Sequence, residues 1–206
     1  MKNTRLTILV ASVIAGAAAC TSIGDNVVDE ADVGDGKADS ALPNANRLTA
    51  AELKTAFAGD AKDALFLSES EFAPEFASVD FAGKRLSVAN VKRALGPAVV
   101  AYFAKESTSI ALADMAVEMS SAQQTRTFLT DLATPNPDDA PDASAAAWGR
   151  IKARLDQNLT NVRAFKMGDK DEHGALTVDQ GFYVWLVVGK TKDGKLAGFM
   201  VGTVET

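Results

Sequence analysis

The chemistry open to this protein is limited first by what its sequence lacks. One cysteine and one histidine occur in 206 residues. A single cysteine excludes an intramolecular disulfide bond, and any nucleophile and base pair would have to use the single histidine, His173. His173 lies in the polar stretch GDKDEHGAL, which is typical of a turn between strands. Glycine-rich phosphate loops and the HExxH, CxxC and GxSxG motifs are also missing. The sequence therefore predicts a protein that is not an enzyme and has no cofactor.

The sequence also has fewer positive than negative charges. The formal net charge is -6, and the pI is about 4.8. The electrostatic field of an acidic protein does not attract nucleic acid or an anionic membrane surface, whereas it does attract a basic protein surface. A protein partner is therefore favoured, and direct binding of nucleic acid is not expected.

The N-terminal hydrophobic run, Leu6 to Ala15, is too short to cross a bilayer as a stable helix. It follows Lys2 and Arg5 and leads through small residues to Cys20, which is the charge layout of an export signal. Residues 1–19 are therefore predicted to be a signal peptide.

Cys20 follows three alanines, and this arrangement resembles a bacterial lipobox, in which the cysteine is lipidated and becomes the new N-terminus. The alternative is an ordinary A-x-A cleavage site that leaves a free thiol. Several acyl chains such as palmitate would anchor the protein, because each buried CH₂ contributes about 0.8 kcal/mol. Thr21 after the cysteine is similar to a sorting signal for the outer membrane. The protein is therefore expected in the bacterial cell envelope, where a lipid anchor would hold it in the outer membrane.

Residues 20–44 are predicted to be a disordered tether from the lipidated Cys20. The stretch from Thr21 to Asn44 has six acidic residues, one lysine and no aromatic residue, so it cannot bury enough apolar surface to fold. A flexible chain of this length would hold a domain roughly 25 to 30 Å from the membrane. Its D-x-x-D-G-K run lacks the alternating ligands of a calcium loop.

Residues 45–206 have the length of one domain with a single sizeable core. Capping boxes at Thr49 with Glu52, and at Ser121 with Gln124, predict the starts of two helices. Two further helices are expected from Ser87 to a stop at Gly96-Pro97 and from about Ala143 to Asn158, where Trp148, Ile151, Leu155 and Leu159 recur at helical spacing. Residues Ala98 to Ala104 are compatible with either strand or helix.

Strand patterns gather near the C-terminus. Gly181 to Gly189 and Leu196 to Thr206 are rich in aromatic and β-branched residues, and the KDGK stretch between them predicts a hairpin turn. Weaker strands are expected at Phe76 to Phe81, Asp114 to Met119 and Val162 to Met167. Helices interspersed with a mainly antiparallel sheet indicate the α+β class and a layered sandwich.

The stretch from Asp169 to Gln180 partly matches an EF-hand loop. Acids stand at positions 1 and 3 and glycine at position 6, but position 5 is His173 and position 12 is Gln180. The bidentate carboxylate that closes the calcium shell is therefore missing. A solvent-exposed hairpin loop is favoured over a calcium site, and no metal site of the protein's own is expected.

Three segments in order, ALFLSESEF (64–72), NLTNVRAFKMG (158–168) and VVGKTKDGKLAGFMVGTVET (187–206), resemble the nuclease A inhibitor-like proteins. The resemblance is clear from the first helix to Phe76 and from Ala147 to the C-terminus. It is loose over the longer middle, Phe81 to Leu132. It implies an α-β-α sandwich that ends in a C-terminal β-hairpin.

The resemblance also implies a function. The founding inhibitor blocks a magnesium-dependent, sugar-nonspecific nuclease with a glutamate that mimics the scissile phosphate, while its C-terminal threonine reaches the catalytic metal. By position these residues are Glu69 and Thr206, with Glu71 beside them. The founding inhibitor has an Asp-Trp pair in the loop after its Thr-Pro; here Asp138 or Asp139 matches the aspartate, and no tryptophan follows. The implied partner is a secreted or periplasmic nuclease.

Two alternatives stay open at this point. The acids of Ser68 to Glu71 are also suited to capping backbone N–H groups of a turn or a helix start. The protein as a whole is also compatible with a surface lipoprotein that keeps the fold but binds another ligand or has a structural role. Trp148 does not replace the missing loop tryptophan, because its helical spacing predicts a core position.

Overall fold

The computed structural model describes residues 42–67, 71–83, 85–106, 108–135, 142–177 and 181–205. Cys20 and the predicted signal peptide lie outside the described residues, as does the tether up to residue 41. In chain order the elements are η1 (Asn44–Asn46), α1 (Ala50–Asp60), β1 (Phe66–Leu67), β2 (Glu71–Phe72), β3 (Glu75–Val79), α2 (Val88–Lys105), η2 (Leu112–Asp114), β4 (Met115–Met119), α3 (Ala122–Leu132), α4 (Ala143–Asn158), β5 (Thr160–Asp169), β6 (Gly181–Lys190) and β7 (Leu196–Glu205).

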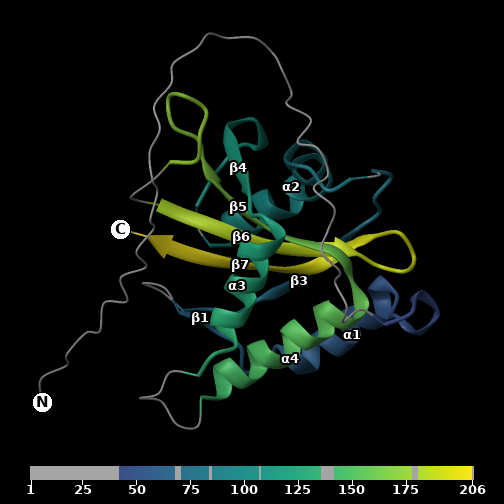
Figure 1. Ribbon diagram of the computed structural model, residues 1–206. Helices are drawn as coiled ribbons and strands as arrows, with labels where there is room; N and C mark the ends of the chain where they lie inside the picture. The colour runs from purple at the N-terminus through teal and green to yellow at the C-terminus, as the bar shows by residue number, and fades with distance from the viewer. Residues whose placement is uncertain are drawn as a thin grey trace, which may run out of the picture. The chain divides into compact units, whose positions relative to one another are not determined.

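Five strands form one antiparallel sheet in the order β3-β7-β6-β5-β4 (Figure 1). β6 and β7 are the central hairpin, with Trp185 opposite Val201 and Lys190 opposite Leu196. β1 and β2 form a separate two-stranded hairpin. The three weaker strand predictions and the C-terminal hairpin are thus confirmed, with small changes at the strand ends.

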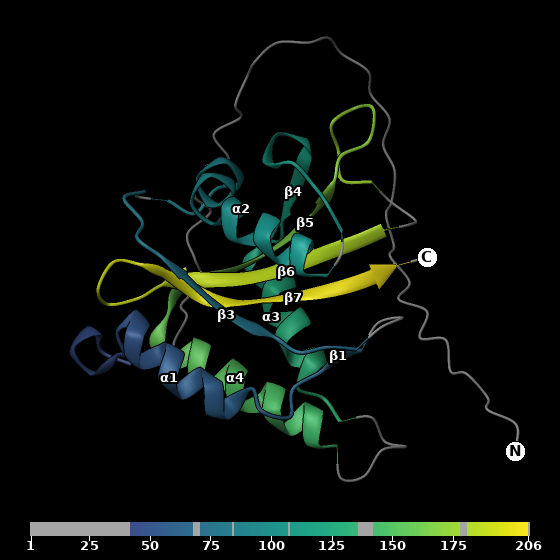
Figure 2. The same ribbon diagram turned by 180° about the vertical axis from the view of Figure 1, so that it is seen from behind.

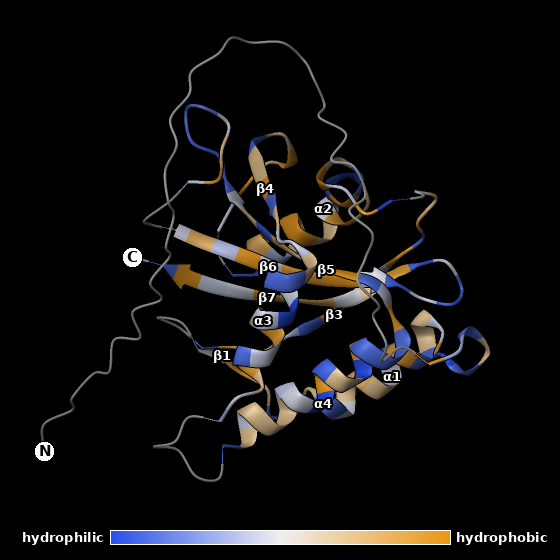
Figure 3. Ribbon diagram, viewed as in Figure 1, coloured by the Kyte–Doolittle hydropathy of each residue, from blue (hydrophilic) through white to orange (hydrophobic). Residues whose placement is uncertain are grey.

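Helices cover both faces of this sheet. The core on one face joins side chains of α1, α3 and α4 to those of β6 and β7, and the core on the other face joins α2 to the same strands. Figure 2 shows α2 lying across the face opposite to α3. In Figure 3 hydrophobic stretches lie along β6 and on α2, whereas the loop after β5 and the turn after β6 are hydrophilic. The predicted α-β-α sandwich of the α+β class is confirmed.

Alternation along β7 divides its side chains between the two cores. Phe199 and Val201 pack with α1 and α4, and Met200 packs on the α2 face, because successive side chains of a strand point to opposite sides. Phe199 lies 5.2 Å from Trp148 between ring centroids. Trp148 is buried with 2% of its surface exposed, as its helical spacing predicted.

The predicted caps start the helices. Thr49 and Ser121 each accept a hydrogen bond from the third helical residue, and the Glu52 and Gln124 side chains complete both capping boxes. α4 spans Ala143–Asn158 as predicted. Across the part of the chain that the structure describes, no helix combines the length and the hydrophobicity needed to span a bilayer.

The predicted stop at Gly96-Pro97 is wrong, because α2 continues through it to Lys105. Pro97 lies on the exposed side of the helix, and its missing N–H and its ring cost about 3 kcal/mol. Beyond it, Val99, Tyr102 and Phe103 are all buried against the sheet. Each such side chain contributes about 1.5 to 3 kcal/mol on burial, so their sum exceeds the cost of the proline. The ambiguous stretch from Ala98 to Ala104 is therefore helix.

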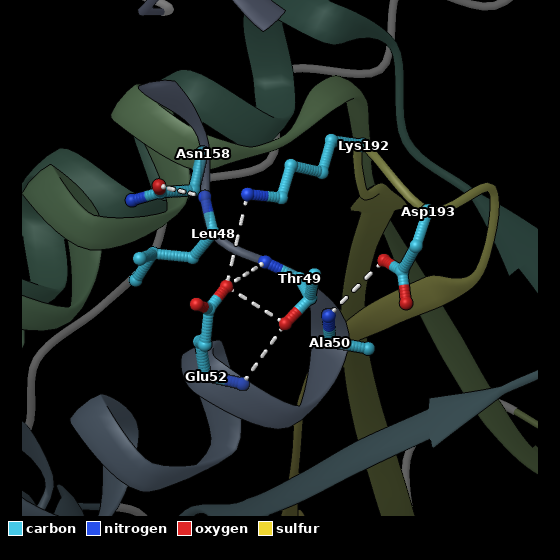
Figure 4. A network of polar contacts seen from close by, with 7 residues as sticks. All are labelled: Leu48, Thr49, Ala50, Glu52, Asn158, Lys192 and Asp193. Atoms are coloured by element: carbon cyan, nitrogen blue, oxygen red, sulfur yellow. Dashed lines mark hydrogen bonds and ion pairs between the residues drawn. The ribbon is translucent and has the colours of Figure 1, made fainter. Parts of the chain in front are cut away.

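The start of α1 is tied to two distant segments (Figure 4). Leu48 N–H donates to the Asn158 side chain at the end of α4 (2.8 Å), and Ala50 N–H donates to Asp193 in the β6–β7 turn (3.1 Å). Glu52 accepts from the backbone N–H of Thr49 (2.8 Å) and lies 3.8 Å from the Lys192 ammonium. This network fixes the end of the domain where the β6–β7 turn lies.

The capping box makes a pH-dependent contribution to stability. Hydrogen bonds from the backbone and side chain of Thr49 lower the pKa of Glu52 from its usual 4.5. A carboxylate with a lowered pKa stabilises the fold above its unfolded pKa, and this stabilisation is lost as pH falls through its folded pKa. Urea unfolding should therefore show that Glu52→Gln is less stable than wild type at pH 7, with a smaller difference at pH 3.5. An equal difference at both pH values would contradict this assignment.

Candidate functional site

The stretch that carries the two predicted surface glutamates begins and ends as a β-hairpin. Phe66 pairs with Phe72 and Leu67 pairs with Glu71 in an antiparallel register. Glu71 thus belongs to the strand β2, and residues 68–70 lie outside the described residues. Glu71 is exposed, and no cation forms an ion pair with it among the residues that the structure describes.

Two aromatic side chains hold this hairpin against the domain. The Phe66 ring lies 6.0 Å from that of Phe128 on α3, and the Phe72 ring lies 5.4 Å from that of Phe182 on β6. Both contacts are made by side chains that alternate with the exposed positions of the hairpin. Phe66 and Phe72 therefore anchor the hairpin, and Glu71 faces solvent.

The base of the hairpin is also fixed by hydrogen bonds to α4. Leu65 N–H donates to the Ser144 hydroxyl oxygen, and the same hydroxyl is 3.0 Å from the Leu65 carbonyl oxygen. That carbonyl also accepts from the indole N–H of Trp148 at 2.9 Å. One residue of the hairpin base thus has its backbone donor and acceptor both bound by the first two turns of α4. Such pairing restricts the angle at which the hairpin leaves the core.

The C-terminal half of β7 lies beside the same hairpin. β3 is antiparallel to β7, with Glu75 opposite Met200, so moving back along the chain from Glu75 moves toward the end of β7. β1 and β2 both contact β7. A Cβ atom on Gly202 would lie 3.0 Å from the Phe72 ring, so the absence of a side chain there admits the aromatic anchor. In Figures 1 and 2 the hairpin and the end of β7 point to the same side.

α2 supports β7 where the pairing with β3 ends. β3 pairs with β7 only as far as Met200, so the N–H of Gly202 has no strand partner on that side. The Tyr102 hydroxyl oxygen accepts this N–H at 3.0 Å. Burial raises the pKa of Tyr102, so its hydroxyl stays neutral at physiological pH. A buried backbone donor is thereby satisfied where the ladder ends.

Of the five residues predicted to bind a partner, the structure describes one. Glu71 is placed on the exposed hairpin, as described above. Glu69, Thr206, Asp138 and Asp139 lie outside the described residues.

The described residues next to these four lie at one end of the domain. Leu67 and Glu71 border Glu69, and Glu205 precedes Thr206 at the end of β7 beside that hairpin. Asp142, which follows residues 136–141 in the sequence, caps α4 by accepting from Ala145 N–H at 2.9 Å. α4 begins at the base of the hairpin, where Ser144 binds Leu65.

The partial EF-hand match is a loop between β5 and β6, as the sequence favoured. The Asp171 carboxylate accepts the backbone N–H groups of His173 and Ala175, both at 2.9 Å. It thereby closes a local turn. His173 is exposed, with 80% of its side chain accessible. Within the described ranges, no three His, Cys, Asp or Glu side chains come together as a potential metal site.

Several residues that shape this end of the domain were not predicted from the sequence. Tyr102 and Gly202 are 100 positions apart, and Ser144 is 79 positions from Leu65. Lys166 pairs with Glu205 at 2.7 Å across 39 positions. Only Lys166 had a local signal, since it is the one charged side chain between two buried residues of a strand, Phe165 and Met167.

The comparison with protein families gives one finding. A family model described as "Nuclease A inhibitor-like protein" matches residues 51–206, which include the middle of the chain where the resemblance was loose. A comparison with curated proteins finds no match.

Proposed function

Since the chain belongs to the nuclease A inhibitor-like family, we propose that it binds and inhibits a magnesium-dependent, sugar-nonspecific nuclease. The family consists of inhibitors and not of enzymes, which agrees with the absence of catalytic motifs from the sequence. A protein partner of the nuclease type follows from this membership.

The observation that carries this proposal is the braced β1–β2 hairpin. It is held by two aromatic contacts and by the hydrogen bonds from Ser144 and Trp148 to Leu65. A hairpin whose strands are fixed in this way before binding loses little conformational freedom on binding, which improves affinity. The hairpin therefore suits the presentation of a carboxylate, which we assign to Glu69.

The proposed mechanism uses the target's own chemistry. A magnesium-dependent nuclease site is built to hold a phosphate anion beside a divalent cation, and Mg²⁺ prefers oxygen ligands. A glutamate carboxylate offers the same charge without a bond that the enzyme can cleave. We assign the phosphate mimic to Glu69 and contact with the target's metal to Thr206, with Glu71 and Asp138 or Asp139 as further contacts.

The proposed place of action is the bacterial cell envelope. Lipidation of Cys20 would anchor the chain in the outer membrane, and residues 20–44 would let the domain reach a periplasmic or secreted nuclease. The negative charge of the protein, -6 overall, favours encounter with a basic partner surface.

The test is an inhibition assay with the protein purified from a bacterial host. We expect wild type to inhibit a magnesium-dependent nonspecific nuclease at or below micromolar concentration. Glu69→Gln keeps the size of the side chain and removes its charge, and deletion of Thr206 removes the second contact. Each change should raise the inhibition constant by about 100-fold, the scale of a lost charged contact in a buried interface.

The outcomes distinguish a nuclease inhibitor from a lipoprotein that has the same fold and another role. Equal potency of wild type, Glu69→Gln and the Thr206 deletion would exclude the proposed site. A complete lack of inhibition at micromolar concentration would favour a lipoprotein that keeps the fold and binds another ligand. A Glu172→Gln variant in the exposed loop after β5 is the matched control, and it should inhibit like wild type.

A further inference from the structure

The last residues of β7 have little support from the main sheet. β3 pairs with β7 only from Leu196 to Met200, and beyond that point β6 is the sole ladder partner. Terminal segments held on one side tend to fray. A chain that uses its C-terminal residue for binding therefore needs an additional constraint close to that residue.

Lys166 provides such a constraint from two strands away. It lies on β5 opposite Trp185 of β6, while Glu205 lies on β7 opposite Gly181. The Lys166 ammonium reaches over β6 to Glu205 Oε2, at 2.7 Å. Only 18% of the Lys166 side chain is exposed, against 43% for Glu205. The contact is thus shielded more than an ordinary surface ion pair, which contributes little to stability.

The Lys166 ammonium packs on the face of the Tyr183 ring, which serves as a platform for it. The Lys166 ammonium is 4.2 Å from the centroid of the Tyr183 ring, a distance at which the ring face attracts a cation. The Tyr183 hydroxyl donates to the Thr177 carbonyl oxygen at 2.7 Å, and the side chain is 1% exposed. A Cβ on Gly168 would lie 2.6 Å from the ring, so glycine makes room for it. The platform is therefore fixed by packing and by a hydrogen bond.

We propose that Lys166 is a positioning residue for inhibition, which holds Glu205 and thereby orients the C-terminal residue toward the target. This inference rests on the proposed function. Lys166 lies on β5, two strands from β7, and only 18% of its side chain is exposed, so it acts through Glu205 and does not contact the partner. Its effect on affinity comes from limiting the freedom that the C-terminus would otherwise lose on binding.

The test compares Lys166→Met with wild type in the full chain. Methionine keeps the length and the apolar stem of lysine and removes the ammonium. We expect the inhibition constant for the nuclease to rise about tenfold, because the end of β7 must then be ordered on binding. In the free protein, amide exchange at Val204 and Glu205 should accelerate by a similar factor. Lys166→Arg, which retains the charge, should restore most of both properties.

Two control variants separate positioning from general stability. Lys195→Met removes an ion pair with Asp80 (2.9 Å) at the opposite end of the same β6–β7 hairpin. Thr49→Ala removes the α1 cap, also at the far end, and costs about 1 kcal/mol of stability. Both variants should leave the inhibition constant and the exchange of Val204 and Glu205 unchanged.

The proposal is overturned if Lys166→Met inhibits like wild type, or if Lys195→Met and Thr49→Ala weaken inhibition as much as Lys166→Met does. It is also overturned if exchange at Val204 and Glu205 is the same in Lys166→Met and wild type. The exchange measurement needs no nuclease, so it tests Lys166 even if wild type fails to inhibit. In that case the proposed function fails separately.

Discussion

Replacement of Trp148 by alanine is expected to lower the free energy of unfolding by about 3 to 5 kcal/mol, the usual cost of removing a large buried aromatic side chain. Trp148 is 2% exposed and packs on Phe199 in the core between α4 and the sheet. The substitution also removes the indole N–H that binds the Leu65 carbonyl. Urea unfolding followed by circular dichroism measures the change, and a loss below about 1 kcal/mol would contradict the core position.

Trp148→Phe separates the packing of this side chain from its hydrogen bond. Phenylalanine retains most of the apolar volume, and the Leu65 carbonyl keeps Ser144 as a partner. We expect a loss of about 1 to 2 kcal/mol, together with weaker nuclease inhibition because the hairpin base is less constrained. Unchanged inhibition in Trp148→Phe would mean that Ser144 alone fixes the hairpin.

Gly198→Ala is expected to cost at least about 3 kcal/mol, at the upper end of the range for overpacking a core. A Cβ on Gly198 would lie 1.9 Å from the Val187 carbonyl oxygen and 2.9 Å from its carbonyl carbon. These atoms belong to the backbone of the neighbouring strand, so no side-chain rotation relieves the clash. β6 and β7 would have to separate at the centre of the sheet. Thermal and urea unfolding of the variant measure the loss.

Gly149→Ala is the matched control for Gly198→Ala. Gly149 lies inside α4, and nothing comes within 4 Å of a Cβ built there. Alanine in a helix interior is favoured over glycine, so this variant should be more stable than wild type by about 0.5 to 1 kcal/mol. A destabilised Gly149→Ala together with a tolerated Gly198→Ala would reverse the assignment of the two glycines.

The local sequence determined where helices begin if the start depends only on neighbouring residues. The Thr49–Glu52 and Ser121–Gln124 capping boxes act over three positions, so they are readable without knowledge of the fold. The helical spacing of Trp148 likewise predicted its buried face. The strands β6 and β7 were predictable because their apolar runs and the turn between them lie within one continuous stretch.

Tertiary packing determined the structure at Gly96-Pro97, where it outweighed a local helix-stop signal. Gly96-Pro97 is a strong local stop, yet α2 continues because residues beyond the proline bury their side chains against strands far away in sequence. The apolar spacing of Val91, Leu95, Val99 and Phe103 runs across the proline at intervals of four residues. Burial of these side chains against the sheet supplies the free energy that exceeds the cost of the proline.

For the candidate site, the sequence by itself determined the kinds of residues and their order in the chain. Its resemblance to a family of inhibitors, now shown by the match over residues 51–206, pointed to the two ends of the domain. The bracing of the hairpin by Ser144 and Trp148, the support of Gly202 by Tyr102 and the Lys166–Glu205 ion pair were decided by tertiary structure alone. Each joins residues 39 to 100 positions apart, and only the antiparallel register of the sheet and the packing of α2 and α4 on it bring such residues into contact.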